Sequence, residues 1–256
     1  MNTRTFILNC PVDLLKKEEA INIVNNTISA KKNFQIITLN PEMIMNAQKN
    51  QDFLNIINKS DLNIPESIGV KLALKFKGIN LNQIRGVDFA RELVKLASLN
   101  NYSIAFLGAK EEIIQKTTQN FKNMYPSLNI VYSHNGYIKG EEEKILNEIK
   151  QANPQILLVG MGSPYQEEII FKLKDILQNT VMIGVGGSFD VFSGVVKESP
   201  LIYQKLGLEW LYRTICQPER FKRIFPVLPI FLIKCIIESI FKKGCYFERI
   251  RKKSKM

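Results

Sequence analysis

The chain has 256 residues, of which 45% are hydrophobic and 23% charged. A chain of this size and composition can bury a full core, which excludes disordered, collagen-like and small disulfide-stapled proteins. Its four cysteines are widely spaced without a Cys-x-x-Cys pair, and it has one histidine, so neither a zinc cluster nor a disulfide framework is supported. The apolar run Phe6-Ile7-Leu8 is too short for a signal-peptide core, and we expect a reducing, cytoplasmic setting.

The net charge of +11 is concentrated at the C-terminal end. Residues 1–196 hold 21 Lys/Arg against 19 Asp/Glu, whereas residues 197–256 hold 14 against 5. A basic tail is typical of proteins that bind nucleic acid, but no nucleic-acid-binding module accompanies it here, so we expect no nucleic-acid partner. The tail also holds the uncharged run 224–233, which is too short to span a bilayer because a spanning helix needs about 20 residues. Two interpretations stay open: a segment at a membrane interface with Lys/Arg facing anionic head groups, which we favour, or a buried helix followed by solvated charges.

In chain order, strand-like apolar runs alternate with helical patterns. The runs cover 5–8, 35–39, 104–107, 129–132, 156–160 and 181–185, and the helical patterns cover 18–31, 111–125, 141–151 and 165–177. This alternation predicts an α/β fold, a Rossmann-like, mostly parallel sheet with helices on both faces. Near residue 197 the strand pattern stops, so we expect a catalytic domain at 1–196 and a helical, basic appendage at 197–256.

Parallel sheets bind ligands beyond the C-terminal ends of their strands, so the loops there are the candidate site. In the first, Asn40 is suited to cap a helix that begins at Pro41, and capping alone would explain it. In the second, Glu66 stands at a strand-to-helix turn, where a general base or a helix-start acid would both fit. The local pattern favours the helix-start acid.

Two glycine-rich loops, 160–166 and 184–190, also follow strands. Glycines let the backbone approach a phosphate, and a helix N-terminus offers free N–H donors. The stretch from Ser163 to Gln166 also reads as a capping box, and tight turning is the alternative role of the second loop. Neither loop completes Gly-x-Gly-x-x-Gly, and no Walker motif exists, which weakens dinucleotide and ATP sites.

The sequence has no Asp-x-Asp, so the usual carboxylate pair for a nucleotide-bound divalent ion is missing. A leaving diphosphate would then need another source of positive charge. Arg213, Arg220 and Arg223 would share one helix face if a single helix continued past Pro218. Arginine suits phosphate oxygens, although these three residues could equally form a solvated basic face.

Taken together, the motifs in this order resemble the WecG/TagA/CpsF family of bacterial glycosyltransferases over nearly the whole chain. The motifs that carry the resemblance are Thr38-Leu39-Asn40-Pro41, Arg85-Gly86-Val87-Asp88, Phe106-Leu107-Gly108, the stretch from Leu158 to Glu167, Gly184-Val185-Gly186-Gly187-Ser188-Phe189-Asp190, and the stretch from Leu206 to Arg213. The resemblance implies transfer of an N-acetylmannosamine-type sugar from a UDP donor to undecaprenyl-diphosphate-linked N-acetylglucosamine. It implies no metal or other cofactor, and a location on the inner face of the cytoplasmic membrane. The product would enter teichoic acid, enterobacterial common antigen or capsule-like polymer synthesis.

The resemblance also implies roles for individual residues. Thr38 and Asn40 would line the site, Glu66 would be the base, Arg85 would approach the donor, and Gln166 would contact substrate. The further substrate-binding positions it implies are Gly162, Gly184, Gly186, Gly187, Asp190, Arg213, Arg220 and Arg223. The donor stays open between N-acetylmannosamine, glucose and N-acetylmannosaminuronic acid, and a homo-oligomer is left open.

One departure from the family pattern concerns the base. The family usually has Pro-Asp-Gly-Ile-Gly where this chain has Pro65-Glu66-Ser67-Ile68-Gly69. The carboxylate is kept but displaced by one methylene, which is compatible with a base farther from the acceptor, altered sugar specificity or impaired activity. Two more distant alternatives are a nucleotide-dependent oxidoreductase, which should show a complete dinucleotide fingerprint, and a non-catalytic basic adaptor for membrane or nucleic acid, which leaves the loops unexplained.

Overall fold

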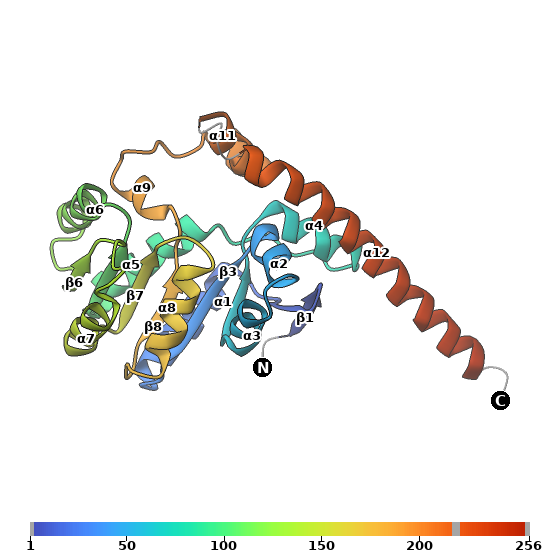
Figure 1. Cartoon of the computed structure of the whole chain (residues 1–256), viewed down its shortest axis with the longest axis horizontal. Helices are drawn as coiled ribbons and strands as arrows, with labels where there is room; N and C mark the ends of the chain where they lie inside the picture. Colours follow the sequence, from blue (N-terminus) through green and yellow to red (C-terminus); the bar gives the residue numbers. More distant parts are fainter. Residues whose placement is uncertain (1–2, 217–220, 254–256) are drawn as a thin grey trace.

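The computed structural model describes residues 3–216 and 221–253 (Figure 1). Within them, a six-stranded parallel sheet has the strand order β4-β3-β8-β7-β5-β6. Its strands are β3 (Phe34–Leu39), β4 (Leu62–Pro65), β5 (Ile104–Gly108), β6 (Ile130–His134), β7 (Ile156–Gly160) and β8 (Val181–Gly184). A separate antiparallel hairpin joins β1 (Arg4–Ile7) to β2 (Cys10–Asp13). The predicted α/β fold is confirmed.

Helices connect the strands and cover both faces of the sheet. In chain order they are α1 (Lys17–Ser29), α2 (Pro41–Ala47), α3 (Gln51–Lys59), α4 (Ile68–Phe76), α5 (Gly86–Asn100), α6 (Glu111–Met124), α7 (Glu142–Ala152), α8 (Tyr165–Lys174), α9 (Ser188–Phe192), α10 (Leu201–Leu206), α11 (Glu209–Cys216) and α12 (Phe221–Lys253).

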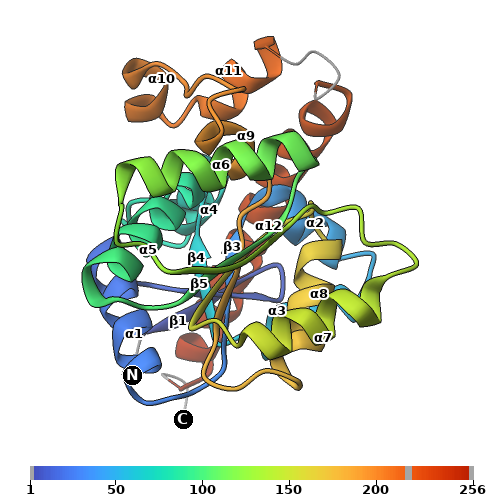
Figure 2. The ribbon, with the colours of Figure 1, turned by 90° about the vertical axis from the view of Figure 1, so that its left-hand side faces the viewer.

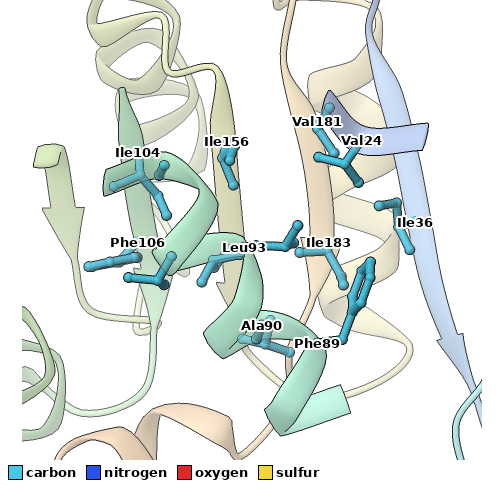
Figure 3. Close-up of a cluster of buried hydrophobic side chains, with 14 of the residues drawn as sticks. Val24, Ile36, Phe89, Ala90, Leu93, Ile104, Phe106, Ile156, Val181 and Ile183 are labelled. Carbon is cyan, nitrogen blue, oxygen red and sulfur yellow. The ribbon is translucent and has the colours of Figure 1, made fainter. Parts of the chain in front are cut away.

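Strands β3, β4, β5, β7 and β8 are buried on both faces, whereas the edge strand β6 is partly exposed. Alternate side chains enter two different parts of the core. On one face, Phe89 and Leu93 of α5 lie with Ile104, Ile156 and Ile183 of three adjacent strands (Figure 3). Helices α1, α6 and α9 complete this cluster. On the other face, the next residue of each strand packs against α7 and α8 or against α2, α3 and α4. Because all six strands are parallel, their C-terminal ends meet at one edge of the sheet.

The C-terminal helices close this edge of the fold. Helices α10 and α11 lie beyond α9 at one end of the molecule (Figure 2). Helix α12 packs against α2 and α4 and extends past them (Figure 1). Pro226 and Pro229 lie inside α12, near its start.

The two faces of α12 have different surroundings. Phe231 and Cys235 are fully buried in the same cluster as residues of α2, α3 and α4, so this face is part of the core. On the outward face, Ile233 is 57% exposed and Ile240 is 63% exposed. The buried-helix interpretation therefore holds for one face, while the other face is apolar and open. No helix in the described part of the chain is long and apolar enough to cross a membrane.

Candidate active site

A cavity of about 440 Å³ opens at the C-terminal edge of β3, β4, β7 and β8. Helices α11 and α12 contribute Trp210, Val227 and Leu228 to its wall. The sequence-predicted residues that line it are Thr38, Asn40, Glu66, Arg85, Gly162, Gln166, Gly186 and Gly187. Loops that lie far apart in the sequence thus meet where a parallel sheet is expected to bind its ligand.

Asn40 and Glu66 form a hydrogen-bonded pair in this cavity. The Asn40 side chain caps α2, accepting from the Met43 N–H at 3.0 Å, as predicted. Its Nδ2 donates to Glu66 Oε2 at 3.3 Å. The Asn40 amide therefore caps α2 with its oxygen and orients the Glu66 carboxylate with its nitrogen.

Glu66 follows β4 directly and lies one residue before the cap of α4. Its backbone N–H donates to Leu39 O at 3.0 Å, which extends the β3–β4 pairing by one residue. Ser67 caps α4 by accepting from the Val70 N–H at 3.4 Å. Ser67 thus has a capping role, and Glu66 directs its carboxylate into the cavity.

Space for that carboxylate comes from a missing side chain at Gly86, the first residue of α5. A Cβ at this position would lie 2.5 Å from Glu66 Oε1 and 3.6 Å from Thr38 Cγ2. Sequence reasoning quoted Gly86 within its motif but assigned it no role. Thr38 itself donates from Oγ1 to Gly184 O at 3.3 Å, tying the end of β3 to β8.

Gln166 connects the two glycine-rich loops. Its Oε1 accepts from the Gly186 N–H at 3.0 Å, and its Nε2 donates to Glu167 Oε1 at 2.6 Å. The predicted capping box is wrong, because α8 is preceded by Pro164 without a side-chain cap. The Gln166 oxygen accepts from an N–H of another loop, that of Gly186, rather than from the backbone at the start of α8.

Two other predicted residues of the second glycine-rich loop lie outside the cavity lining. Gly184 is the last residue of β8, beneath the cavity, and its carbonyl accepts from Thr38. Asp190 lies within α9, where its backbone carbonyl accepts from Ser193 Oγ at 2.9 Å. Of this loop, Val185, Gly186, Gly187 and Ser188 line the cavity.

Glu167 is a buried carboxyl group that sequence reasoning missed. Only 1% of its surface is exposed. This burial raises the pKa of Glu167 to about 7, although hydrogen bonds from Gln166 and Ser163 act to lower it. The signal in the sequence was its position next to Gln166 in the Gly160–Glu167 motif.

Arg85 lines the cavity and is held by acidic partners. Its guanidinium pairs with Asp88 at 2.9 Å, Glu198 at 3.1 Å and Glu209 at 2.7 Å. It also donates to Gln204 Oε1 at 2.7 Å. Partial burial lowers the pKa of Arg85, but these carboxylates, Glu209 foremost, raise it above its ordinary value. Arg85 therefore joins α5 to the region of α10 and α11, a contact that the predicted role at the donor does not include.

The three predicted tail arginines do not share one helix. Arg213 belongs to α11, which ends at Cys216, and Arg223 belongs to α12, which begins at Phe221. Arg220 lies outside the described residues. Among the residues that the structure describes, no three His, Cys, Asp or Glu side chains gather in a group that could hold a metal ion.

The sequence is similar to one family of known proteins. The sequence model of the glycosyl transferase WecG/TagA/CpsF family matches residues 5–244. The N-acetylglucosaminyldiphosphoundecaprenol N-acetyl-beta-D-mannosaminyltransferase of Staphylococcus aureus (strain NCTC 8325 / PS 47) is 35% identical over 203 residues, which cover 79% of each chain. The protein of the same name from Bacillus subtilis (strain 168) is 34% identical over 212 residues, which cover 82% of each chain. The chain belongs to the WecG/TagA/CpsF family and is a glycosyltransferase.

Proposed function

We propose that this enzyme moves an N-acetylmannosamine-type sugar from UDP to N-acetylglucosamine on undecaprenyl diphosphate, with inversion and without a metal ion. The relatives are named for transfer of N-acetyl-beta-D-mannosamine to that acceptor. The observation that carries the mechanism is the Glu66 carboxylate, which Asn40 orients within the cavity that the two glycine-rich loops border. The cavity, at about 440 Å³, lies within the usual range of about 300–1,000 Å³ for small-molecule sites.

In this mechanism the acceptor hydroxyl attacks the anomeric carbon while Glu66 takes its proton. The bond between that carbon and the UDP oxygen breaks on the opposite face, so the sugar is inverted and UDP leaves. A positioned base typically contributes about 10²–10⁴-fold to the rate. The charge on the departing diphosphate would be met by the arginines of the tail, as the family resemblance implies. The lack of an Asp-x-Asp motif supports transfer without a metal ion.

The test is turnover with a lipid-linked N-acetylglucosamine acceptor and a panel of UDP-sugars, with chelator present. UDP release and product mass are measured, and UDP-glucose and UDP-N-acetylmannosaminuronic acid are the competing donors. Glu66→Gln should lower turnover about 10²–10⁴-fold and leave UDP binding nearly unchanged. Glu42→Gln tests a second glutamate that lines the cavity, the third being Glu209, which pairs with Arg85. Loss of turnover in Glu42→Gln but not in Glu66→Gln would assign the base to Glu42.

We also propose that the outward face of α12 lies on the inner face of the cytoplasmic membrane. This face is apolar, with Ile233, Ile237 and Ile240 all substantially exposed, and a basic segment follows it in the sequence. An apolar helix face beside Lys and Arg is typical of peripheral attachment to anionic lipids. Such a location would bring the cavity to a lipid-linked acceptor.

Deletion from Pro226 onward would not test this cleanly, because it also removes the buried Phe231 and Cys235. Changing Ile233, Ile237 and Ile240 together to Asn alters only the outward face. This variant should lose binding to phosphatidylglycerol vesicles in a flotation assay. A control variant changes Leu99 and Met124, exposed apolar residues of α5 and α6, to Asn. Equal vesicle binding by all three proteins would favour a solvated tail.

A further inference from the structure

Glu167 is a buried acid to which the proposed transfer gives no role. It is the third residue of α8, lies below the cavity and is not part of its lining. Taking a carboxylate out of water is unfavourable unless the group is hydrogen-bonded. The contacts that it makes therefore indicate what it does.

Its main contact fixes the orientation of the neighbouring amide. Glu167 Oε1 lies 2.6 Å from Gln166 Nε2, and Gln166 Oε1 lies 3.0 Å from the Gly186 N–H. Glu167 Oε1 accepts this hydrogen bond, so the NH₂ end of Gln166 faces the carboxyl group. The oxygen end is thereby directed at Gly186. Without Glu167, the amide could rotate and leave that N–H unpaired.

The amide–carboxyl pair is also held by close packing. A Cβ on Gly184 would lie 2.5 Å from Gln166 Nε2 and 2.7 Å from Glu167 Oε1, so the pair fills the space left by this glycine. From the other side, Gln35 Nε2 of β3 donates to the backbone carbonyl of Glu167 at 3.3 Å. The end of β8 and the start of α8 thus meet through these two side chains, directly beneath the loop that contains Gly186.

We propose that Glu167 is a positioning residue that acts through Gln166 to hold the loop after β8 in the conformation that receives the nucleotide part of the donor. The nucleotide in this statement rests on the proposed function. The positioning of the loop rests only on the hydrogen bonds and packing described above. Two measurements separate these parts.

The first measurement is hydrogen exchange at the Gly186 amide, followed by NMR in the protein without ligand. Glu167→Ala should raise its exchange rate about 5- to 13-fold, because loss of one hydrogen bond of about 1–1.5 kcal/mol corresponds to that range. Glu167→Gln keeps an acceptor for Gln166 and should retain most of the protection. Glu168→Ala, a change at the half-exposed next residue, is the matched control and should leave the rate unchanged. Unchanged exchange in Glu167→Ala would overturn the proposal.

The second measurement is a double-mutant cycle on UDP binding by calorimetry. Gln166→Ala and Glu167→Ala should each weaken UDP binding by similar factors, and the double variant should bind no more weakly than Gln166→Ala alone. Additive losses would show that Glu167 acts independently of Gln166 and would refute the inference. Circular dichroism of each variant separates these effects from unfolding.

The outcomes also distinguish this inference from the proposed function. One possible result is that UDP binds and the cycle is non-additive, but no UDP-sugar is turned over. In that case Glu167 keeps its positioning role and the proposed reaction fails. If the wild-type protein binds no UDP, the nucleotide part is overturned and exchange at Gly186 alone decides the positioning of the loop.

Discussion

Gly86→Ala tests how closely the fold has been fitted around the Glu66 carboxylate. Gly86 does not have a positive φ, so alanine suits its backbone, but the new Cβ would lie 2.5 Å from Glu66 Oε1. Ordinary contact begins near 3.4 Å, so the oxygen must move by about 0.9 Å. Such a shift would also stretch the 3.3 Å bond from Asn40. Misplacing a catalytic group by about 1 Å can lower the rate about 10²-fold, or about 2.7 kcal/mol in activation free energy.

The folded state should tolerate this change, because the clash is with the mobile end of a side chain. The free energy of unfolding should stay within about 1 kcal/mol of wild type, since alanine is favoured over glycine in a helix. UDP release with saturating donor and acceptor measures turnover, and denaturant unfolding measures stability. The same change in a Glu66→Asp background is the control, because the shorter carboxylate leaves room for the Cβ. An equal loss of turnover in both backgrounds, or none in either, would refute the steric argument.

Three further predictions concern other contacts of the described residues. Asn40→Ala should lower the free energy of unfolding by about 1 kcal/mol, because α2 loses its cap. Asn40→Asp should keep the cap and the stability but lower turnover, because the new Asp carboxylate lies next to that of Glu66. Glu238→Gln should lower the melting temperature by a few degrees, because it breaks the 2.9 Å ion pair between Glu238 of α12 and Lys77. The side chains of Glu238 and Lys77 are only 15% and 12% exposed. Glu167 has a pKa raised from 4.5 to about 7, so the folded state holds its proton more tightly than the unfolded state. The free energy of unfolding should therefore fall by about 3 kcal/mol as pH rises from 4.5 to 7 and then level off, and denaturant titrations of Glu167→Gln should lack this fall.

The sheet was largely predictable, because a strand that is buried on both faces reads as a continuous apolar run. All six predicted runs form strands, with ends that differ by no more than two residues. The prediction missed β2 and gave no bounds for β4, although it placed Glu66 at a strand-to-helix turn; both strands are short and interrupted by Pro11, Asn63 and Pro65. Asn63 is buried because its Nδ2 donates to Ile57 O at 3.1 Å and its backbone N–H donates to Asp13 at 2.7 Å. Such distant partners make a polar residue suitable for a strand, and the local sequence does not reveal them.

The candidate site divides in the same way between local and distant contacts. The role of Asn40 as a cap was predictable, because its partner Met43 is three residues away. The role of Gln166 was not, because the N–H that it accepts from belongs to Gly186, 20 residues further along the chain. Arg85 also depends on a distant partner, since it bonds to Glu198, 113 residues away. Residue type and motif can place a side chain at the edge of a parallel sheet, but its partners there depend on the strand order.

Helix α12 belongs to the predicted appendage and packs against the predicted catalytic domain. Phe231 and Cys235 bind it to the core, while Val227 and Leu228, one turn or more earlier, line the cavity. Leu228 Cδ1 would lie 3.1 Å from a Cβ on Gly69, one turn after Glu66, so α12 touches the helix that begins beside the carboxylate. A division at residue 197 therefore separates the strands from the basic tail in sequence but not in space. The same helix therefore forms a wall of the site with Val227 and Leu228 and exposes an apolar face on its outward side.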